Sequence, residues 1–130
     1  MTVFLSRDQV LDVHRLQIAR FGGEFGLRDR GLLESAFARP QMTFGGEDLY
    51  PDVPAKAAAL MHSLVMNHPF IDGNKRVGAH ASILFLLVNG LEPVFAPQEL
   101  TDVTLAVARV EVSAEALAIW IRQRSRLQNG

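Results

Sequence analysis

The most apolar run of the sequence, Val77 to Val88, is the feature that most constrains the fold. It follows closely on Asn74 and ends at Asn89-Gly90, where glycine can take the left-handed position that follows a helix. The run is too short to cross a bilayer, which takes about 20 residues in a helix. Its side chains therefore have to be buried within the protein, and we predict a core helix here.

Helix signals divide most of the remaining chain into further helices. Small polar residues suit N-cap positions and prolines suit the first helical turn. No repeat, low-complexity tract or linker interrupts the chain. We therefore predict one domain, residues 1–130, of the mostly α class, with about six helices around a central apolar helix. The expected helix starts are Ser6, Asp29, Pro54, Pro97 and Ser113.

The helical pattern is lost between the second and third predicted helices. Gly45-Gly46 stands there between two short extended stretches, which predicts a small β-hairpin. We call residues 43–50 the flap. Its residues are Thr43, Phe44, Gly45, Gly46, Glu47, Asp48, Leu49 and Tyr50.

Composition excludes several classes of protein. The chain has no cysteine, so a disulfide framework, a zinc–thiolate site and a thiol nucleophile are impossible. The formal net charge of -1 gives no global basic field for nucleic acid. The start, MTVFLSRDQ, lacks the features of a signal peptide. We expect a cytoplasmic protein that binds neither a membrane nor, directly, nucleic acid.

The segment NHPFIDGNKRVGAH leads directly into the apolar helix and gathers polar groups at its start. The first N–H groups of a helix lack intrahelical partners and carry the positive end of the helix dipole. A glycine-containing turn that enters such an end favours phosphate binding. Candidate phosphate-binding residues are Gly73, Asn74, Lys75 and Arg76.

Two further side chains beside these phosphate-binding residues could take part in a reaction. Asp72 would repel phosphate unless a divalent cation lay between them, and Mg²⁺ commonly binds one or two carboxylates together with phosphate oxygens. His68 titrates near neutral pH and can accept the proton of an attacking hydroxyl. Together they indicate a nucleotide-dependent transferase, with ATP and Mg²⁺ as the expected ligands.

Residues 68–76, HPFIDGNKR, resemble the signature of the Fic/Doc superfamily, His-x-Phe-x-(Asp/Glu)-(Gly/Ala)-Asn-x-Arg. The stretches GLRDRGLLESAFARPQ, GGEDLYP and ILFLLVNG look like the death-on-curing (Doc) toxin branch. The resemblance implies a Fic fold with His68 as general base, Asp72 on Mg²⁺ and residues 74–76 on phosphates. It also implies that the flap holds the target segment as an added strand.

Lys75 separates two activities within that resemblance. The adenylyl-transferring branch usually has glycine there and a second arginine three residues after the first, where this chain has Ala79. Doc proteins share the lysine and are understood to bind ATP reversed and to transfer its γ-phosphate to a threonine of elongation factor Tu, which arrests translation. We therefore expect a toxin kinase. The alternatives are an adenylyltransferase and a catalytically silent Fic-fold binding module.

The resemblance also bears on restraint of such a toxin. Many members carry an inhibitory Ser/Thr-x-x-x-Glu-Gly/Asn helix, and none is evident in this sequence. We expect instead a separate antitoxin whose disordered segment folds on binding.

The remaining polar residues of interest have structural interpretations. His14 and His62 fall on predicted helices, where a packed histidine is the default. His80 lies one turn after Arg76 and shares its face, which fits a place beside the nucleotide and fits packing almost as well. Gly78 costs a helix about 1 kcal/mol relative to alanine. Either a close helix crossing or a close nucleotide would account for it.

Overall fold

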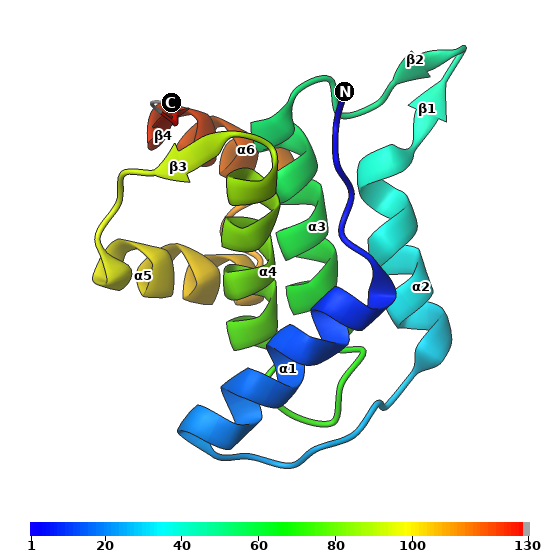
Figure 1. Cartoon of the computed structure of the whole chain (residues 1–130), viewed down its shortest axis with the longest axis vertical. Helices are drawn as coiled ribbons and strands as arrows, with labels where there is room; N and C mark the ends of the chain where they lie inside the picture. The colour runs from blue at the N-terminus through cyan, green and yellow to red at the C-terminus, as the bar shows by residue number, and fades with distance from the viewer. Residues whose placement is uncertain (129–130) are drawn as a thin grey trace.

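The computed structural model of the chain describes residues 1–128. Figure 1 shows a bundle of helices with two small two-stranded sheets at its margins. The helices are α1 (Arg7–Phe21), α2 (Arg30–Ala38), the 3₁₀ turn η1 (Arg39–Gln41), α3 (Val53–Asn67), α4 (Asn74–Val88), α5 (Pro97–Ala108) and α6 (Ala114–Gln123). The strands are β1 (Thr43–Phe44), β2 (Glu47–Asp48), β3 (Leu91–Pro93) and β4 (Ser125–Leu127). The predicted mostly α fold with a β-hairpin is confirmed.

Helices α3 and α4 lie side by side at the centre of the bundle (Figure 1). α3 also contacts α2, α5 and α6, so nearly all of its length is buried. The apolar run forms α4 as predicted, and its inner face is buried. Its last residues, Leu87 and Val88, remain exposed, because α4 has neighbours on fewer sides than α3.

Gly78 lies where α3 and α4 cross. A Cβ added there would come within 2.7 Å of Val65 Cγ2 and 3.2 Å of the Met61 carbonyl oxygen. Real Cβ atoms do not approach other atoms that closely, so only glycine allows the two helices to pack at this separation. Of the two explanations that the sequence left open for Gly78, the structure supports the close helix crossing.

Local signals set the helix ends largely as expected. Ser6 forms the capping box of α1 with Gln9, and Asp29 and Ser113 accept backbone N–H groups at the starts of α2 and α6. Gly22 ends α1. The antiparallel pairing of β3 with β4, Leu91 opposite Leu127, was not predicted. Within residues 1–128, no helix is long and apolar enough to cross a membrane.

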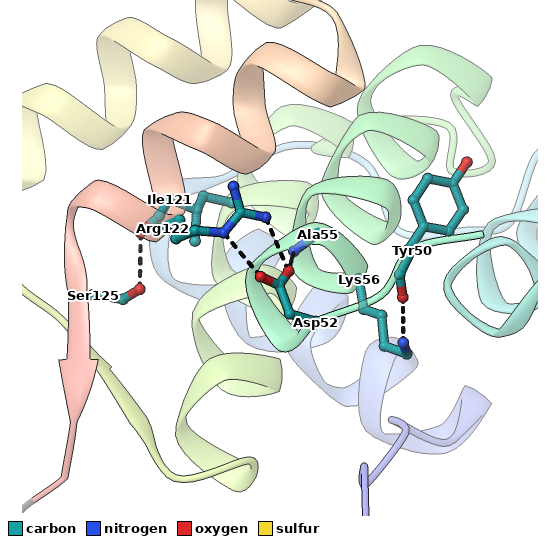
Figure 2. Close-up of polar contacts among 7 residues, drawn as sticks. All are labelled: Tyr50, Asp52, Ala55, Lys56, Ile121, Arg122 and Ser125. Carbon is teal, nitrogen blue, oxygen red and sulfur yellow. Dashed lines mark hydrogen bonds and ion pairs between the residues drawn. The ribbon is translucent and has the colours of Figure 1, made fainter. Parts of the chain in front are cut away.

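The start of α3 is tied to the end of α6 through Asp52, the N-cap of α3 (Figure 2). Its carboxylate accepts the Ala55 N–H and pairs with the Arg122 guanidinium at 2.8 Å and 3.0 Å. Arg122 thus joins two helices across the fold. The hydrogen bond from Arg122 is the main cause that holds the pKa of Asp52 below its ordinary value.

This pair predicts a pH-dependent contribution to stability. Asp52→Asn keeps an N-cap side chain but removes the charge, and it should lower the free energy of unfolding at pH 7 by about 0.5–1 kcal/mol, because the pair is partly exposed. A lowered folded-state pKa stabilises the fold above the unfolded value, about 3.9, and this contribution disappears as the pH falls through the folded pKa.

Urea denaturation of both proteins between pH 7 and pH 2 measures that difference. The gap between wild type and Asp52→Asn should close at the acid end. An Arg122→Gln background is the control. The pH-dependent gap should be smaller there, because only the Ala55 N–H and the charge of Lys56 still lower the pKa of Asp52. A gap of constant size down to pH 2 would show that the charge of Asp52 is not the cause.

Candidate active site

The motif loop, residues 68–73, connects α3 to α4 and is shaped by two left-handed residues. His68 ends α3 with φ 50° and ψ 55°, and Gly73 precedes α4 with φ 79°. Phe70 between them is 1% exposed and anchors the loop in the core. The reversal of the chain therefore places the motif loop and the first turn of α4 at the same end of the bundle (Figure 1).

The segment between α1 and α2 holds this loop from outside. Arg28 donates to the carbonyls of His68 and Asn67 at 2.6 Å and 2.9 Å, so its positive charge meets the negative end of the α3 dipole. The Ile71 N–H donates to the Gly26 carbonyl, and Leu27 forms a β-bridge with Phe70. Sequence reasoning gave Arg28 no place in the site. Only its position in GLRDRG, a stretch shared with the Doc branch, could have suggested one.

The side chain of Asn74 bonds to the backbone of the motif loop. Its side-chain oxygen accepts the Phe70 N–H at 2.9 Å, and its amide donates to the Phe70 carbonyl at 3.0 Å. Both polar atoms of the side chain therefore close the motif loop. Any contact of Asn74 with phosphate would come from its backbone N–H, at an end of α4 that no side chain caps in the described structure.

The residues expected to do the chemistry do line one cavity, of about 280 Å³. Gly73 lines it, and a Cβ on Gly73 would meet Ile18 Cδ1 at 3.1 Å, so glycine lets the turn pack closely against α1. Within residues 1–128, no carboxylate pairs with Lys75 or Arg76. Two cations without acidic partners beside a helix N-terminus favour an anionic ligand. The lining residues are His68, Ile71, Asp72, Gly73, Asn74, Lys75 and Arg76.

Asp72 is the residue that could hold a metal ion. Its carboxylate is exposed and receives the N–H groups of Gly73 at 2.8 Å and Glu24 at 3.2 Å. Glycine at position 23 leaves room for it, because a Cβ there would lie 2.8 Å from Asp72 Oδ2. In the described residues no three potential ligands gather around one point. One carboxylate beside a phosphate cradle fits Mg²⁺, which takes few protein ligands and keeps several waters.

His14 is a second residue of the site that sequence reasoning missed. It is 4% exposed, its ring stacks on Phe70 with centroids 3.9 Å apart, and its Nε2 donates to the Asp72 carbonyl at 2.9 Å. The prediction that His14 is a packed histidine on a helix agrees with its burial in α1. Its hydrogen bond, however, fixes the backbone of the candidate metal ligand.

We expect substitutions of His14 to separate that hydrogen bond from packing. His14→Phe keeps the stack but loses the donor, so the Mg²⁺ concentration for half-maximal activity should rise by about tenfold. His14→Gln can restore the donor and should recover most of the affinity for Mg²⁺. Mg²⁺ titrations of activity, with the melting temperature measured in parallel, test this. Equal Mg²⁺ dependence in the two variants would contradict a positioning role.

Two of the predicted site features lie outside this cavity. His80 lines an adjacent cavity instead. The flap hairpin forms as predicted, with Thr43 opposite Asp48, but it lies at the other end of α3 from the motif loop (Figure 1). At 1.5 Å per residue, the length of α3 separates the two by roughly 20 Å. No flap residue lines the cavity of His68.

Buried contacts hold the flap at that position. Lys56 of α3 is 3% exposed, and its ammonium donates to the Asp48 carboxylate at 3.1 Å. It also donates to the Tyr50 carbonyl (Figure 2). Arg39 donates to the Tyr50 hydroxyl, and also to His62 Nδ1 at 2.9 Å. His62 thus has the structural role that its helical position predicted.

The arrangement of the helices, together with the motif loop, is that of a Fic-fold protein. Residues 4–86 match the Fic/DOC family, and the chain belongs to that family. It is 48% identical over 92 residues to the protein named Toxin Doc of Mycolicibacterium smegmatis (strain ATCC 700084 / mc(2)155), which covers 71% of this chain and 68% of that protein. It is 31% identical over 119 residues to Protein kinase doc of Escherichia phage P1, covering 92% and 93% of the two chains. The predicted relation to the Doc toxin branch is confirmed.

Proposed function

We propose that the protein is a toxin kinase that transfers the γ-phosphate of ATP to a hydroxyl of a target protein. The observation that carries the proposal is the single cavity that brings His68 and Asp72 together with Lys75 and Arg76. A base, a metal ligand and phosphate-binding cations are the parts that phosphoryl transfer needs. A relative whose printed name is Protein kinase doc supports the same activity.

In the proposed reaction His68 accepts the proton of the attacking hydroxyl as that oxygen bonds to the γ-phosphorus. The bond between the γ-phosphorus and the β,γ-bridging oxygen breaks, and ADP leaves. Lys75, Arg76 and the first N–H groups of α4 hold the phosphate oxygens and offset their charge. Asp72 would hold Mg²⁺, which supplies further charge neutralisation when bound. Arg28 and His14 keep the two ends of the motif loop in place through the carbonyls of His68 and Asp72.

Transfer of AMP is the alternative on the same scaffold, and two residues speak against it. Lys75 replaces the glycine of the adenylyl-transferring branch, and it adds bulk and charge where a triphosphate would run in that branch. Ala79 cannot clamp a terminal phosphate as the second arginine would. The silent binding module is disfavoured because His68 and Asp72 are both present and share the cavity.

The target and partner that we propose follow the Doc resemblance. The target is a threonine of elongation factor Tu in the cytoplasm, and the restraint comes from an antitoxin whose disordered segment folds on binding. The position of the flap constrains target docking. A segment added to β1 or β2 would have to continue along α3 for roughly 20 Å before its hydroxyl reached His68.

The test uses purified protein, Mg²⁺ and elongation factor Tu with ATP labelled at either the γ- or the α-phosphate. Incorporation from the γ position alone supports the kinase. Incorporation from the α position would establish AMP transfer instead. If neither label enters elongation factor Tu but the γ label enters another protein of a cell extract, the kinase holds and the target is wrong.

A further inference from the structure

Phe21, the last residue of α1, is a large aromatic residue that stays exposed. Its exposed fraction is 52%, and Gly22 then ends the helix with φ 85°. Within the part of the chain that the structure describes, its ring is not among the residues of the hydrophobic core. The end of α1 lies at the same end of the bundle as the start of α4 (Figure 1). The contacts of this ring are therefore made at the surface, beside the motif loop.

The ring of Phe21 lies against the guanidinium group of Arg76. The guanidinium carbon is 4.9 Å from the ring centroid, within the roughly 6 Å over which an aromatic face attracts a cation. Arg76 belongs to the first turn of α4 and lines the cavity of His68. The contact therefore connects the end of α1 to one of the two cations that we propose to hold phosphate.

An aromatic ring holds an arginine differently from a carboxylate. Across residues 1–128, neither Arg76 nor Arg20 forms an ion pair. A carboxylate would offset the charge of Arg76 and occupy some of its N–H groups, which would weaken its attraction for an anion. The face of a ring attracts the cation without accepting those hydrogen bonds or adding a negative charge. Phe21 can therefore restrain Arg76 and leave its charge and its donors to phosphate oxygens.

Arg20 is a second cation beside the same ring. Its guanidinium carbon lies 5.5 Å from the centroid. Its positive charge also lowers the pKa of His80, although burial is the main cause of that shift. Arg20 precedes Phe21 in the chain, so its contact with the ring is local, whereas the contact of Arg76 joins two helices. An experiment on Phe21 therefore has to separate the two contacts.

We propose that Phe21 is a positioning residue for phosphate binding, and that its ring orients the Arg76 guanidinium in the cavity of His68. An arginine side chain is long and flexible, and a contact that restricts it beforehand reduces the freedom it loses when a ligand binds. The phosphate chain then meets a cation that is already in place. This inference rests on the proposed use of ATP. It adds a residue outside the motif loop that sets the affinity for the phosphates.

Calorimetry with ATP and Mg²⁺ measures the expected loss of affinity. Phe21→Leu keeps an apolar side chain but removes the ring, and it should raise the Kd of ATP by about threefold to tenfold. Phe21→Tyr keeps the ring and should stay within about twofold of wild type. Phe25→Leu is the matched control, because Phe25 is 57% exposed and lines a cavity that does not include Arg76. It should leave the Kd unchanged.

Double variants identify which contact carries the effect. In an Arg76→Gln background, Phe21→Leu should change the Kd of ATP by less than about twofold, because the partner of the ring is gone. In an Arg20→Gln background the whole effect should remain. If Phe21→Leu matched the wild type, if Phe21→Tyr lost as much affinity as Phe21→Leu, or if the loss persisted without Arg76, the proposal would be overturned and the kinase would stand. The expected pattern in a protein that phosphorylates no target would support the role of Phe21 and refute the kinase.

Discussion

Replacing His68 with alanine should lower the rate of phosphoryl transfer by about 10²–10⁴-fold, the usual contribution of a general base. His68 ends α3 and is exposed in the cavity that also contains Asp72 and Arg76. Without its imidazole the attacking hydroxyl has to lose its proton to water. The measurement is single-turnover transfer of labelled γ-phosphate to the target, and expression of the variant should no longer arrest growth.

Two controls separate this chemical effect from loss of the site. Far-ultraviolet circular dichroism and the melting temperature should be close to wild type, because the His68 side chain is exposed and its backbone carbonyl still accepts from Arg28. The Kd of ATP should change little, because the phosphate-binding groups are untouched. Undiminished transfer, or undiminished toxicity on expression, would refute the role of His68 as base.

Gly78→Ala is expected to destabilise the protein although alanine is the better helix former. In an exposed helix the exchange would stabilise by about 1 kcal/mol. At Gly78 the added methyl would lie 2.7 Å from Val65 Cγ2, and the Met61 carbonyl on α3 leaves no room for α4 to shift sideways. Overpacking of this kind costs about 1–3 kcal/mol. Set against the helix gain of about 1 kcal/mol, this leaves a net loss of up to about 2 kcal/mol in the free energy of unfolding, measured by urea denaturation.

Gly31→Ala is the matched control. Gly31 is exposed in α2, and its added Cβ would meet only the Asp29 side chain, at 3.3 Å. There the helix preference for alanine is not opposed by another helix, so the stability should change by no more than about 1 kcal/mol. A stabilised Gly78→Ala variant would mean that α3 and α4 can separate without cost and that the close crossing is not what requires glycine.

The elements that follow from the sequence alone are those whose causes are local. Ser6, Asp29 and Ser113 cap helices through N–H groups three residues away. Gly45-Gly46 forms the hairpin turn because both residues take positive φ. The pairing of β3 with β4 joins segments that are distant in sequence. It could not be predicted because it depends on where α4 and α6 end in space.

The candidate active site likewise has a part that the sequence predicts and a part that depends on tertiary packing. The sequence alone could predict that His68, Asp72, Lys75 and Arg76 come together, because they lie on one short loop and the helix turn that follows it. What holds that loop, and what lies beside it, depends on tertiary packing. His14 and Arg28 reach the loop from other elements. The cavity that Ala79 and His80 line also needs α5, and the flap lies at the opposite end of α3 from the motif loop (Figure 1). Those contacts depend on how the helices pack, which the local pattern of residues does not specify.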